Sequence, residues 1–277
     1  MEVFNSVRSL QKKITSYKKT NSIAFVPTMG ALHKGHLSLI KKAQSENDLV
    51  VVSIFVNPTQ FDNKEDLIKY PKTLEADLKL LKKVKCDMVF TPTVKEIYNE
   101  DVVSKHYKFD GLENEMEGKF REGHFNGVAT IVQRLFEIVT PDKAYFGKKD
   151  FQQLQIIKKL VAIEKLPIKI VGCKIFREKD GLAMSSRNVR LSKQHRKSAP
   201  FIYKTLKKAK KKLQNKSIEE ILHWVNKKFK KHPFLELEYF IIADEITLKD
   251  SIVKDDNLRG FIAVFAGEIR LIDNIKL

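Results

Sequence analysis

The chain has 277 residues, of which 43% are hydrophobic and 31% are charged, and its formal net charge is +18. These fractions are typical of a soluble globular protein, and no apolar run approaches the roughly 20 residues of a membrane span, which excludes a membrane-spanning protein. The amino terminus lacks the basic-then-apolar order of a signal sequence, so we expect a cytoplasmic protein. The positive charge attracts anions, whether nucleotide, acidic metabolite or nucleic acid, without choosing among them.

Hydrophobic periodicity predicts that helices and strands alternate through the first 175 residues. In chain order we expect a helix at 6–18, a strand at 23–26, a helix after Gly35, a strand at 49–56, a helix at 73–84, a strand at 87–90, a helix at 127–139, a strand at 144–146, a helix at about 150–164 and a strand at 168–171. Pro27 should end the first strand, because proline has no N–H for the ladder. Residues 93–126 are irregular and could form a loop over an active site. This alternation predicts an α/β fold with a Rossmann-like, doubly wound parallel sheet, which binds ligands beyond the carboxyl ends of its strands.

The pattern changes near residue 176. A polar loop at residues 176–192 precedes lysine-rich helices near 193–213 and 217–231 and strands near 236–243, 261–265 and 268–272. We therefore expect two domains, a Rossmann-like domain of residues 1–175 and a smaller carboxyl-terminal α+β domain of residues 176–277. Cys86 and Cys173 lie far apart in apolar surroundings, which favours reduced cysteines in a core.

The stretch most indicative of function is Pro-Thr-Met-Gly-Ala-Leu-His-Lys-Gly-His at residues 27–36. It spans the turn from the first strand into a helix, and the N–H groups at a helix start attract anions such as phosphate. Gly30 and Gly35 allow a ligand to approach the backbone closely, and His33 and His36 add two donors at the same place. From this stretch alone, a zinc site and a purely structural turn stay open as alternatives.

Three later loops carry polar side chains. Asn57 and Gln60 follow the strand at 49–56, and their amides can bind hydroxyl or carboxylate groups, although stabilising a turn is the commoner role of such residues. Gly-Lys-Lys-Asp at 147–150 could bind a nucleotide or simply cap the next helix. Met-Ser-Ser-Arg at 184–187 could clamp a phosphate or form an ordinary polar loop.

Together these strings resemble those of the pantothenate synthetase (pantoate–β-alanine ligase) family, in the His-Xaa-Gly-His nucleotidyltransferase superfamily. The resemblance runs nearly from end to end, through strings at residues 27–36, 52–61, 70–73, 123–128, 151–154, 180–188 and 270–274. It implies that the carboxylate of (R)-pantoate attacks the α-phosphorus of ATP, giving pantoyl adenylate and pyrophosphate. The amine of β-alanine then displaces AMP and yields pantothenate, a step of the coenzyme A pathway. Such catalysis depends on positioning and electrostatics.

The resemblance also implies roles for individual residues. The catalytic groups would be His36, His33, Lys149 and Arg187. The ATP site would comprise Met29, Gly30, His33, His36, Gly147, Lys148, Lys149, Asp150, Phe176, Met184, Ser185, Ser186 and Arg187. Pantoate would be bound by Gln60, Gln153 and Asn57, and Mg²⁺, which accompanies ATP, by Asp77 in addition to the phosphates. A homodimer, and closure of the smaller domain over the active site, are implied as well.

Two positions depart from the family pattern. Lys148 stands where the family usually has glutamate, and Phe176 where a smaller aliphatic residue commonly lines the adenine site. We expect the Lys148 side chain to face solvent while its backbone binds ATP. Arg121 and His124 fall within a family string for which the resemblance gives no clear role.

Two other functions compete with this interpretation. One is a different His-Xaa-Gly-His enzyme, either a nucleotidyltransferase or another adenylating enzyme. The other is a basic nucleic-acid-binding protein that uses the lysine runs at residues 207–212 and 227–231. These runs lack interleaved arginine and regularly spaced aromatic residues, which disfavours nucleic-acid binding. We therefore expect ATP, (R)-pantoate and β-alanine as ligands, and neither nucleic acid nor a membrane as a partner.

Overall fold

The computed structural model describes residues 1–61, 64–98, 102–255 and 257–277, so residues 99–101 of the expected loop at 93–126 lie outside the described part. The chain divides into two compact units. Unit 1 consists of Met1–Lys148 and Gln152–Lys174, and unit 2 of Lys149–Phe151 and Ile175–Leu277. The boundary therefore falls inside the string at 147–150, because Lys149 and Asp150 belong to unit 2 together with Phe151, which follows them.

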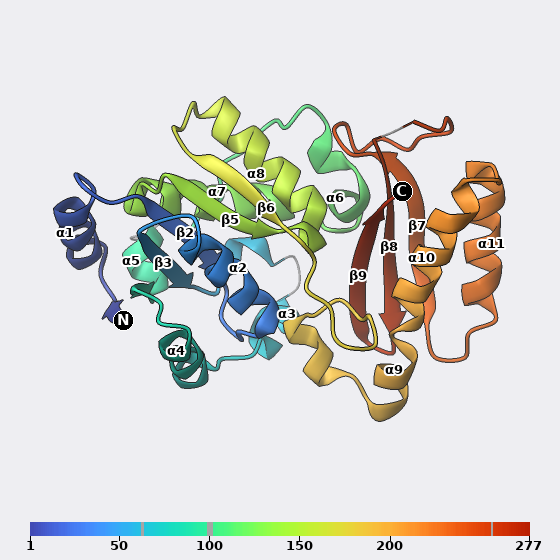
Figure 1. Cartoon of the computed structure of the whole chain (residues 1–277), viewed down its shortest axis with the longest axis horizontal. Coiled ribbons are helices and arrows are strands. Elements are labelled where there is room, and N and C mark those ends of the chain that lie inside the picture. Colours follow the sequence, from blue (N-terminus) through green and yellow to red (C-terminus); the bar gives the residue numbers. More distant parts are fainter. Residues whose placement is uncertain (62–63, 99–101, 256) are drawn as a thin grey trace. The chain divides into compact units, whose positions relative to one another are not determined.

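Unit 1 is built on a parallel sheet of six strands in the order β1-β4-β3-β2-β5-β6 (Figure 1). The strands are β1 (Glu2–Phe4), β2 (Ile23–Thr28), β3 (Leu49–Ile54), β4 (Met88–Phe90), β5 (Lys143–Gly147) and β6 (Lys169–Cys173). The inner strands β2 and β3 are almost entirely buried, as the continuous apolar runs require. The predicted doubly wound α/β fold is confirmed, and the carboxyl ends of β3, β2 and β5 are neighbours along one edge of the sheet.

Helices flank this sheet. They are α1 (Val7–Tyr17), α2 (Lys34–Gln44), α3 (Lys64–Lys69), α4 (Leu74–Lys83), α5 (Val94–Tyr98), α6 (Met116–Phe120), α7 (His124–Val139) and α8 (Phe151–Ile163), with short 3₁₀ helices η1 (Pro58–Gln60), η2 (Leu112–Asn114) and η3 (Lys148–Asp150). Within the described ranges, no helix of either unit is long and apolar enough to cross a membrane. Cys86 and Cys173 are both buried free thiols, as expected.

Several expectations for unit 1 need correction. Pro27 does not end the first strand, because β2 continues to Thr28 and at Pro27 pairs with β3 only, where a residue without an N–H is tolerated. The stretch at 93–126 is not irregular throughout, since it contains α5, η2 and α6 and the start of α7. β1 and α3 were not anticipated either, because β1 is a strand of three residues that begins with Glu2 and α3 has only Leu67 and Ile68 as apolar positions, too few to form an apolar run or a helical period.

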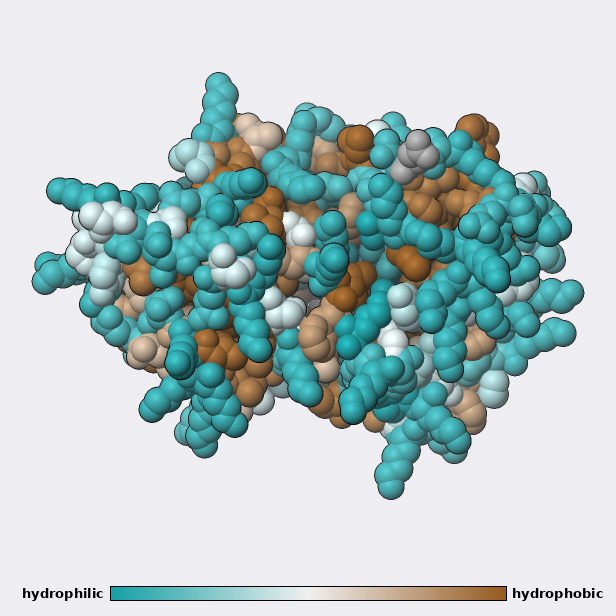
Figure 2. Space-filling view, viewed as in Figure 1, coloured by the Kyte–Doolittle hydropathy of each residue, from teal (hydrophilic) through white to brown (hydrophobic). Residues whose placement is uncertain are grey.

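Unit 2 is the expected α+β fold. Its antiparallel sheet contains β7 (Glu236–Asp244), β8 (Leu258–Ala266) and β9 (Ile269–Lys276), in that order. The helices are α9 (Lys193–Ser198), α10 (Phe201–Leu213) and α11 (Ile218–Lys230), and η4 (Ser186–Arg190) precedes them. The apolar faces of α10 and α11 pack on the sheet in one core, while their lysine-rich faces are hydrophilic surface (Figure 2).

Candidate functional site

The turn between β2 and α2 has a backbone shape that only certain residues permit. Gly30 has φ +81°, and a Cβ at this position would lie 3.1 Å from both Asp77 Oδ2 and Ile54 Cγ2. Ala31 also has a positive φ of 48°, which strains a residue with a side chain. The turn therefore needs an external partner that stabilises this conformation.

Asp77, in the first turn of α4, is that partner. Its Oδ1 accepts the Leu32 N–H at 2.7 Å, and its Oδ2 accepts the Ala31 N–H at 2.9 Å and the Thr73 hydroxyl at 3.1 Å. The carboxylate is 2% exposed, and both of its oxygens serve the turn. In the described part of the chain, no group of three or more His, Cys, Asp or Glu side chains could hold a metal ion. The geometry thus favours a bracing role for Asp77 over Mg²⁺ ligation.

We expect Asp77→Asn to destabilise unit 1 by about 1–3 kcal/mol. The amide nitrogen of asparagine cannot accept a hydrogen bond, so one of the two backbone N–H groups loses its partner. The strained turn would relax, and ATP affinity would fall with it. Thermal unfolding and ATP titration measure the two effects. Replacing the exposed Glu75 of the same helix turn with glutamine is the matched control and should change neither. A loss of affinity that added Mg²⁺ restored would instead support metal ligation.

The two histidines form a reciprocal cap at the start of α2. His33 Nδ1 accepts the Gly35 N–H at 3.1 Å, and His36 Nδ1 accepts the His33 N–H at 3.3 Å. The rings stack with their centroids 4.0 Å apart. When Nδ1 of a neutral imidazole accepts a hydrogen bond, the ring carries its proton on Nε2. The cap therefore makes both Nε2 atoms donors, which suits an anion and disfavours zinc, whose ligand nitrogen must be unprotonated.

Asn57 and Gln60 lie around η1, directly after β3. Asn57 is 1% exposed, its Nδ2 donates to Gly127 O at 3.2 Å and Gln60 Oε1 at 3.3 Å, and its Oδ1 accepts the Tyr98 hydroxyl at 2.6 Å. Burial raises the pKa of Tyr98, so the phenol remains protonated and donates. Gln60 Nε2 lies 2.9 Å from Met29 Sδ, which places Gln60 beside the first turn. Asn57 thus orients Gln60, and both polar atoms of its side chain are engaged by other residues.

The structure gives the string at 123–128 a role that the sequence did not reveal. His124 Nδ1 donates to Gln60 O at 2.7 Å, and Arg121 reaches both His124 Nε2, at 3.2 Å, and Gln60 O, at 3.4 Å. A Cβ at Gly127 would lie 2.1 Å from Thr59 O, so the first turn of α7 packs directly on the backbone of η1. Arg121, His124 and Gly127 therefore position the segment that carries Gln60.

Gly147 is the last residue of β5, which neighbours β2 in the sheet, and Lys148 follows it. The Lys148 side chain is half-buried, and its Cε lies 3.2 Å from where a Cβ of Gly172 would be. Its methylene chain packs against β6, in contrast with the expectation that the side chain faces solvent. Gln153, also half-buried, lies in the first turn of α8.

Unit 2 brings other predicted residues together. Lys149, Ser185 and Arg187 line one pocket with Arg270 and Asp273. Three cationic side chains and a hydroxyl in one concave site suit a phosphate or another anion, although Arg270 is also paired with Glu238. The pocket gathers groups from residue 149 and residues 185–187, which are far apart in the sequence.

The loop that leads to this pocket is ordered by its own backbone. The Met184 N–H donates to Phe176 O at 3.0 Å, and the Ser185 hydroxyl accepts the Arg187 N–H at 3.2 Å as the N-cap of η4. Ser186 is the first residue of η4. Phe176 is 38% exposed, and Asp150 is exposed with an oxygen 3.4 Å from Lys149 Nζ.

Comparisons with known proteins match the chain over its whole length. The family model described as pantoate-beta-alanine ligase matches residues 2–276. A pantothenate synthetase of Christiangramia forsetii is 54% identical, with 100% of this chain and 99% of that protein covered. The crystal structure of pantothenate synthetase from Thermus thermophilus has a TM-score of 0.94 at 40% identity and covers 100% of this chain and 99% of its own. A pantoate-beta-alanine ligase from Francisella tularensis, complexed with beta-gamma ATP and beta-alanine, has a TM-score of 0.82 at 37% identity, with 100% and 97% covered.

Proposed function

Because the chain belongs to the pantoate-beta-alanine ligase family, we infer that it joins pantoate to β-alanine in an ATP-dependent reaction. The enzyme is a ligase that forms a C–N bond. The pantoate carboxylate attacks the α-phosphorus of ATP to form pantoyl adenylate and pyrophosphate, and the β-alanine amine then attacks the acyl carbon and releases AMP. Family membership decides against a different His-Xaa-Gly-His enzyme.

The observation that carries the assignment of the site is the reciprocal cap of His33 and His36. We propose that their Nε2–H groups, at the start of α2, donate to the ATP phosphates and stabilise the charge that develops during adenylation. Met29 and Gly30 would lie along the phosphates, and Gly147 and Lys148 would meet the nucleotide from the neighbouring strand end. In unit 2, Lys149, Ser185, Ser186 and Arg187 would contact phosphate. Asp150, Phe176 and Met184 would contact the nucleoside.

We propose that Gln60 and Gln153 bind pantoate through its carboxylate and hydroxyl groups. Amides suit this task because they add no charge beside a nucleophilic carboxylate that must approach a polyanion. Asn57 would act indirectly, since its amide is committed to Gln60, Gly127 and Tyr98.

The family uses ATP and generally a divalent metal. We propose that the metal is Mg²⁺ and that it arrives with ATP, with the phosphates as its main ligands. The three hydrogen bonds that the two Asp77 oxygens accept from the Ala31 N–H, the Leu32 N–H and the Thr73 hydroxyl disfavour Asp77 as a further ligand. Dimer formation, a cytoplasmic location and closure of unit 2 over the active site stay predictions, as does the lack of a nucleic-acid partner.

Pyrophosphate exchange with one substrate omitted at a time tests the function. We expect exchange of labelled pyrophosphate into ATP that requires pantoate and does not require β-alanine. Exchange supported by amino acids in the absence of pantoate would reject the proposal, and so would exchange that occurs only with β-alanine present.

Gln60→Ala should raise the KM for pantoate by about 10-fold, the loss of one or two hydrogen bonds to a charged group, while the KM for ATP changes little. Initial rates with each substrate varied in turn provide the measurement. Gln11→Ala, on the exposed surface of α1, is the control. Equal increases in both KM values would mean that Gln60 has a structural role.

A further inference from the structure

Two neighbouring residues of β9, Asp273 and Asn274, are buried polar side chains to which the reaction gives no direct part. They are 4% and 2% exposed, and they pair with Ile262 and Phe261 of β8, the middle strand of the unit 2 sheet. Buried polar side chains in a strand must be satisfied by hydrogen bonds, so the partners of these two residues indicate which segments the strand holds in place.

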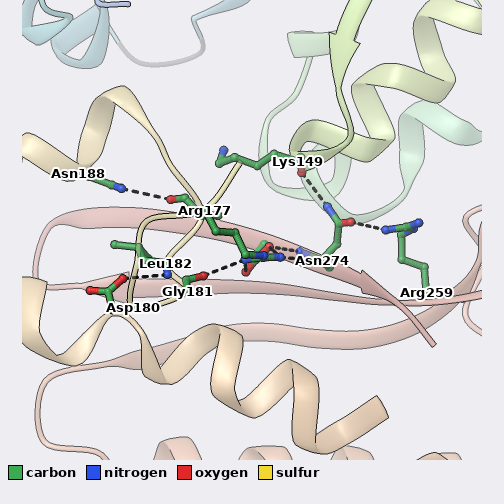
Figure 3. Close-up of polar contacts among 10 residues, drawn as sticks. Lys149, Arg177, Asp180, Gly181, Leu182, Asn188, Arg259 and Asn274 are labelled. Atoms are coloured by element: carbon green, nitrogen blue, oxygen red, sulfur yellow. Dashed lines mark hydrogen bonds and ion pairs between the residues drawn. The ribbon is translucent and has the colours of Figure 1, made fainter. Parts of the chain in front are cut away.

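Asn274 is bound on both sides of its amide. Its Nδ2 donates to Lys149 O at 2.8 Å, and its Oδ1 accepts from Arg259 Nη1 at 2.6 Å (Figure 3). Since a guanidinium only donates, the amide oxygen must face Arg259 and the amide nitrogen must face the Lys149 carbonyl.

Arg259 is itself fixed. Its Nε and Nη2 lie 2.9 and 2.6 Å from Glu245 Oε1, and its guanidinium stacks 4.2 Å from the centre of the Phe151 ring. The position of Lys149 is thus determined by a side chain that cannot rotate without breaking a buried contact.

Asp273 acts on another segment. It forms a bidentate ion pair with Arg177 at 2.6 and 2.9 Å. Arg177 Nη1 also donates to Gly181 O at 3.1 Å, and its guanidinium lies 3.5 Å from the centre of the Tyr203 ring. Burial raises the pKa of the Asp273 carboxyl and the guanidinium of Arg177 opposes that rise, so each charge depends on the other.

Arg177 belongs to a small hairpin that leads directly to the Met-Ser-Ser-Arg string at residues 184–187. Arg177 pairs with Ala183 in an antiparallel bridge, and the Glu178 N–H donates to Leu182 O at 2.8 Å. Ser185 follows this hairpin within two residues. Asp273 therefore fixes one side of the pocket of unit 2, and Asn274 fixes the other.

We propose that Asp273 and Asn274 are the positioning residues for the nucleotide-binding groups of unit 2. Asn274 sets the place of Lys149 through its carbonyl, and Asp273 sets the place of Ser185 and Arg187 through Arg177. The inference rests on the proposed function, in which Lys149, Ser185 and Arg187 contact ATP. One strand thus aligns two segments that must meet the same polyphosphate.

Asn274→Asp is the decisive variant. The carboxylate still accepts from Arg259, so the buried guanidinium keeps a partner, but it cannot donate to the Lys149 carbonyl. We expect the KM and the Kd for ATP to rise about fivefold to tenfold, the loss of one hydrogen bond, with the KM for pantoate unaltered. The unfolding temperature should fall as well, because a carboxylate oxygen then faces the Lys149 carbonyl at a buried position. Asn226→Asp is the matched control, since it removes the same type of bond, from Asn226 Nδ2 to Leu222 O at 2.9 Å, on the exposed surface of α11.

A double-mutant cycle with Lys149→Ala separates positioning from stability. If Asn274 acts through Lys149, the double variant should bind ATP no more weakly than Lys149→Ala alone. Additive losses would overturn the inference. If Lys149→Ala by itself left ATP binding unchanged, the assignment of Lys149 in the proposed function would fail, and this inference with it.

Arg177→Lys tests the second half and remains informative if Asn274→Asp does not fold. Lysine keeps the charge opposite Asp273 and loses the fork that also reaches Gly181. We expect a severalfold weaker affinity for ATP, with pantoate unaffected. An unchanged affinity for ATP in a folded Arg177→Lys enzyme would reject the role of Asp273.

Discussion

Replacing His36 with alanine is expected to lower the rate of pantoate-dependent pyrophosphate exchange by about 10²- to 10³-fold, the usual loss when one preorganised donor to a transition state is removed. The Nε2–H of His36 lies at the start of α2, where backbone N–H groups and the helix dipole already favour an anion. The loss should appear in kcat more than in the KM for ATP, because the phosphates gain charge during the attack.

Two further substitutions separate the catalytic role of His36 from its capping role. Asparagine can accept the His33 N–H in place of Nδ1 but places no donor at the position of Nε2. Glutamine places an amide N–H near Nε2 but no acceptor near Nδ1. We therefore expect His36→Asn to retain the stability of α2 and lose activity, and His36→Gln to recover part of the activity.

The measurements are exchange rates and thermal unfolding of the same preparations. A His36→Asn enzyme with a normal rate would show that the Nε2 donor is dispensable, and the proposed role of His36 would have to be abandoned.

Gly127→Ala is expected to reduce kcat/KM for pantoate by about 10²-fold, because a displacement of about 1 Å in a positioning segment costs that much. The added Cβ would lie 2.1 Å from Thr59 O and 2.6 Å from Thr59 C, far inside van der Waals contact. Backbone cannot move aside as a flexible side chain does, so η1 must shift, and Asn57 and Gln60 shift with it. Overpacking of this kind also destabilises a protein by about 1–3 kcal/mol.

The matched control for Gly127→Ala is Gly260→Ala in β8, where the nearest side-chain atom would be 3.5 Å from the new Cβ. It should leave the kinetics with pantoate unchanged. The KM for pantoate and the unfolding temperature of both variants provide the comparison. If Gly127→Ala lowered stability without changing pantoate kinetics, the string at 123–128 would stabilise the fold only.

Much of unit 1 could be predicted from the sequence, because buried parallel strands are short apolar runs and amphipathic helices repeat at 3.6 residues. The short helices at 94–98 and 116–120 were not predicted, because five residues are too few to establish a helical period. The prediction that Pro27 ends its strand was wrong, because proline is excluded only from strand positions that are paired on both sides, and Pro27 is paired on one.

Among the candidate site residues, His33 and His36 could be singled out from their spacing at a helix start. The functions of Asp77, His124, Asp273 and Asn274 could not, because each depends on a partner more than 45 residues away in the sequence or on which atom of the side chain faces it. Asp77 illustrates the difference, since a carboxylate near a nucleotide site suggests a metal until its two oxygens are seen to accept backbone N–H groups.

The sequence by itself determined the α/β class, the two-part organisation and the family, because hydrophobic period and long motif strings are local properties of the chain. Only the tertiary structure decided which polar side chains are committed to buried hydrogen bonds with other residues. Asn57 and Gln60 are both amide residues that follow β3, yet the Asn57 side chain is engaged in hydrogen bonds to Gln60, Gly127 and Tyr98. The physical reason is that a buried polar atom must be satisfied by whatever the fold brings against it, and that partner is not encoded in the neighbouring residues.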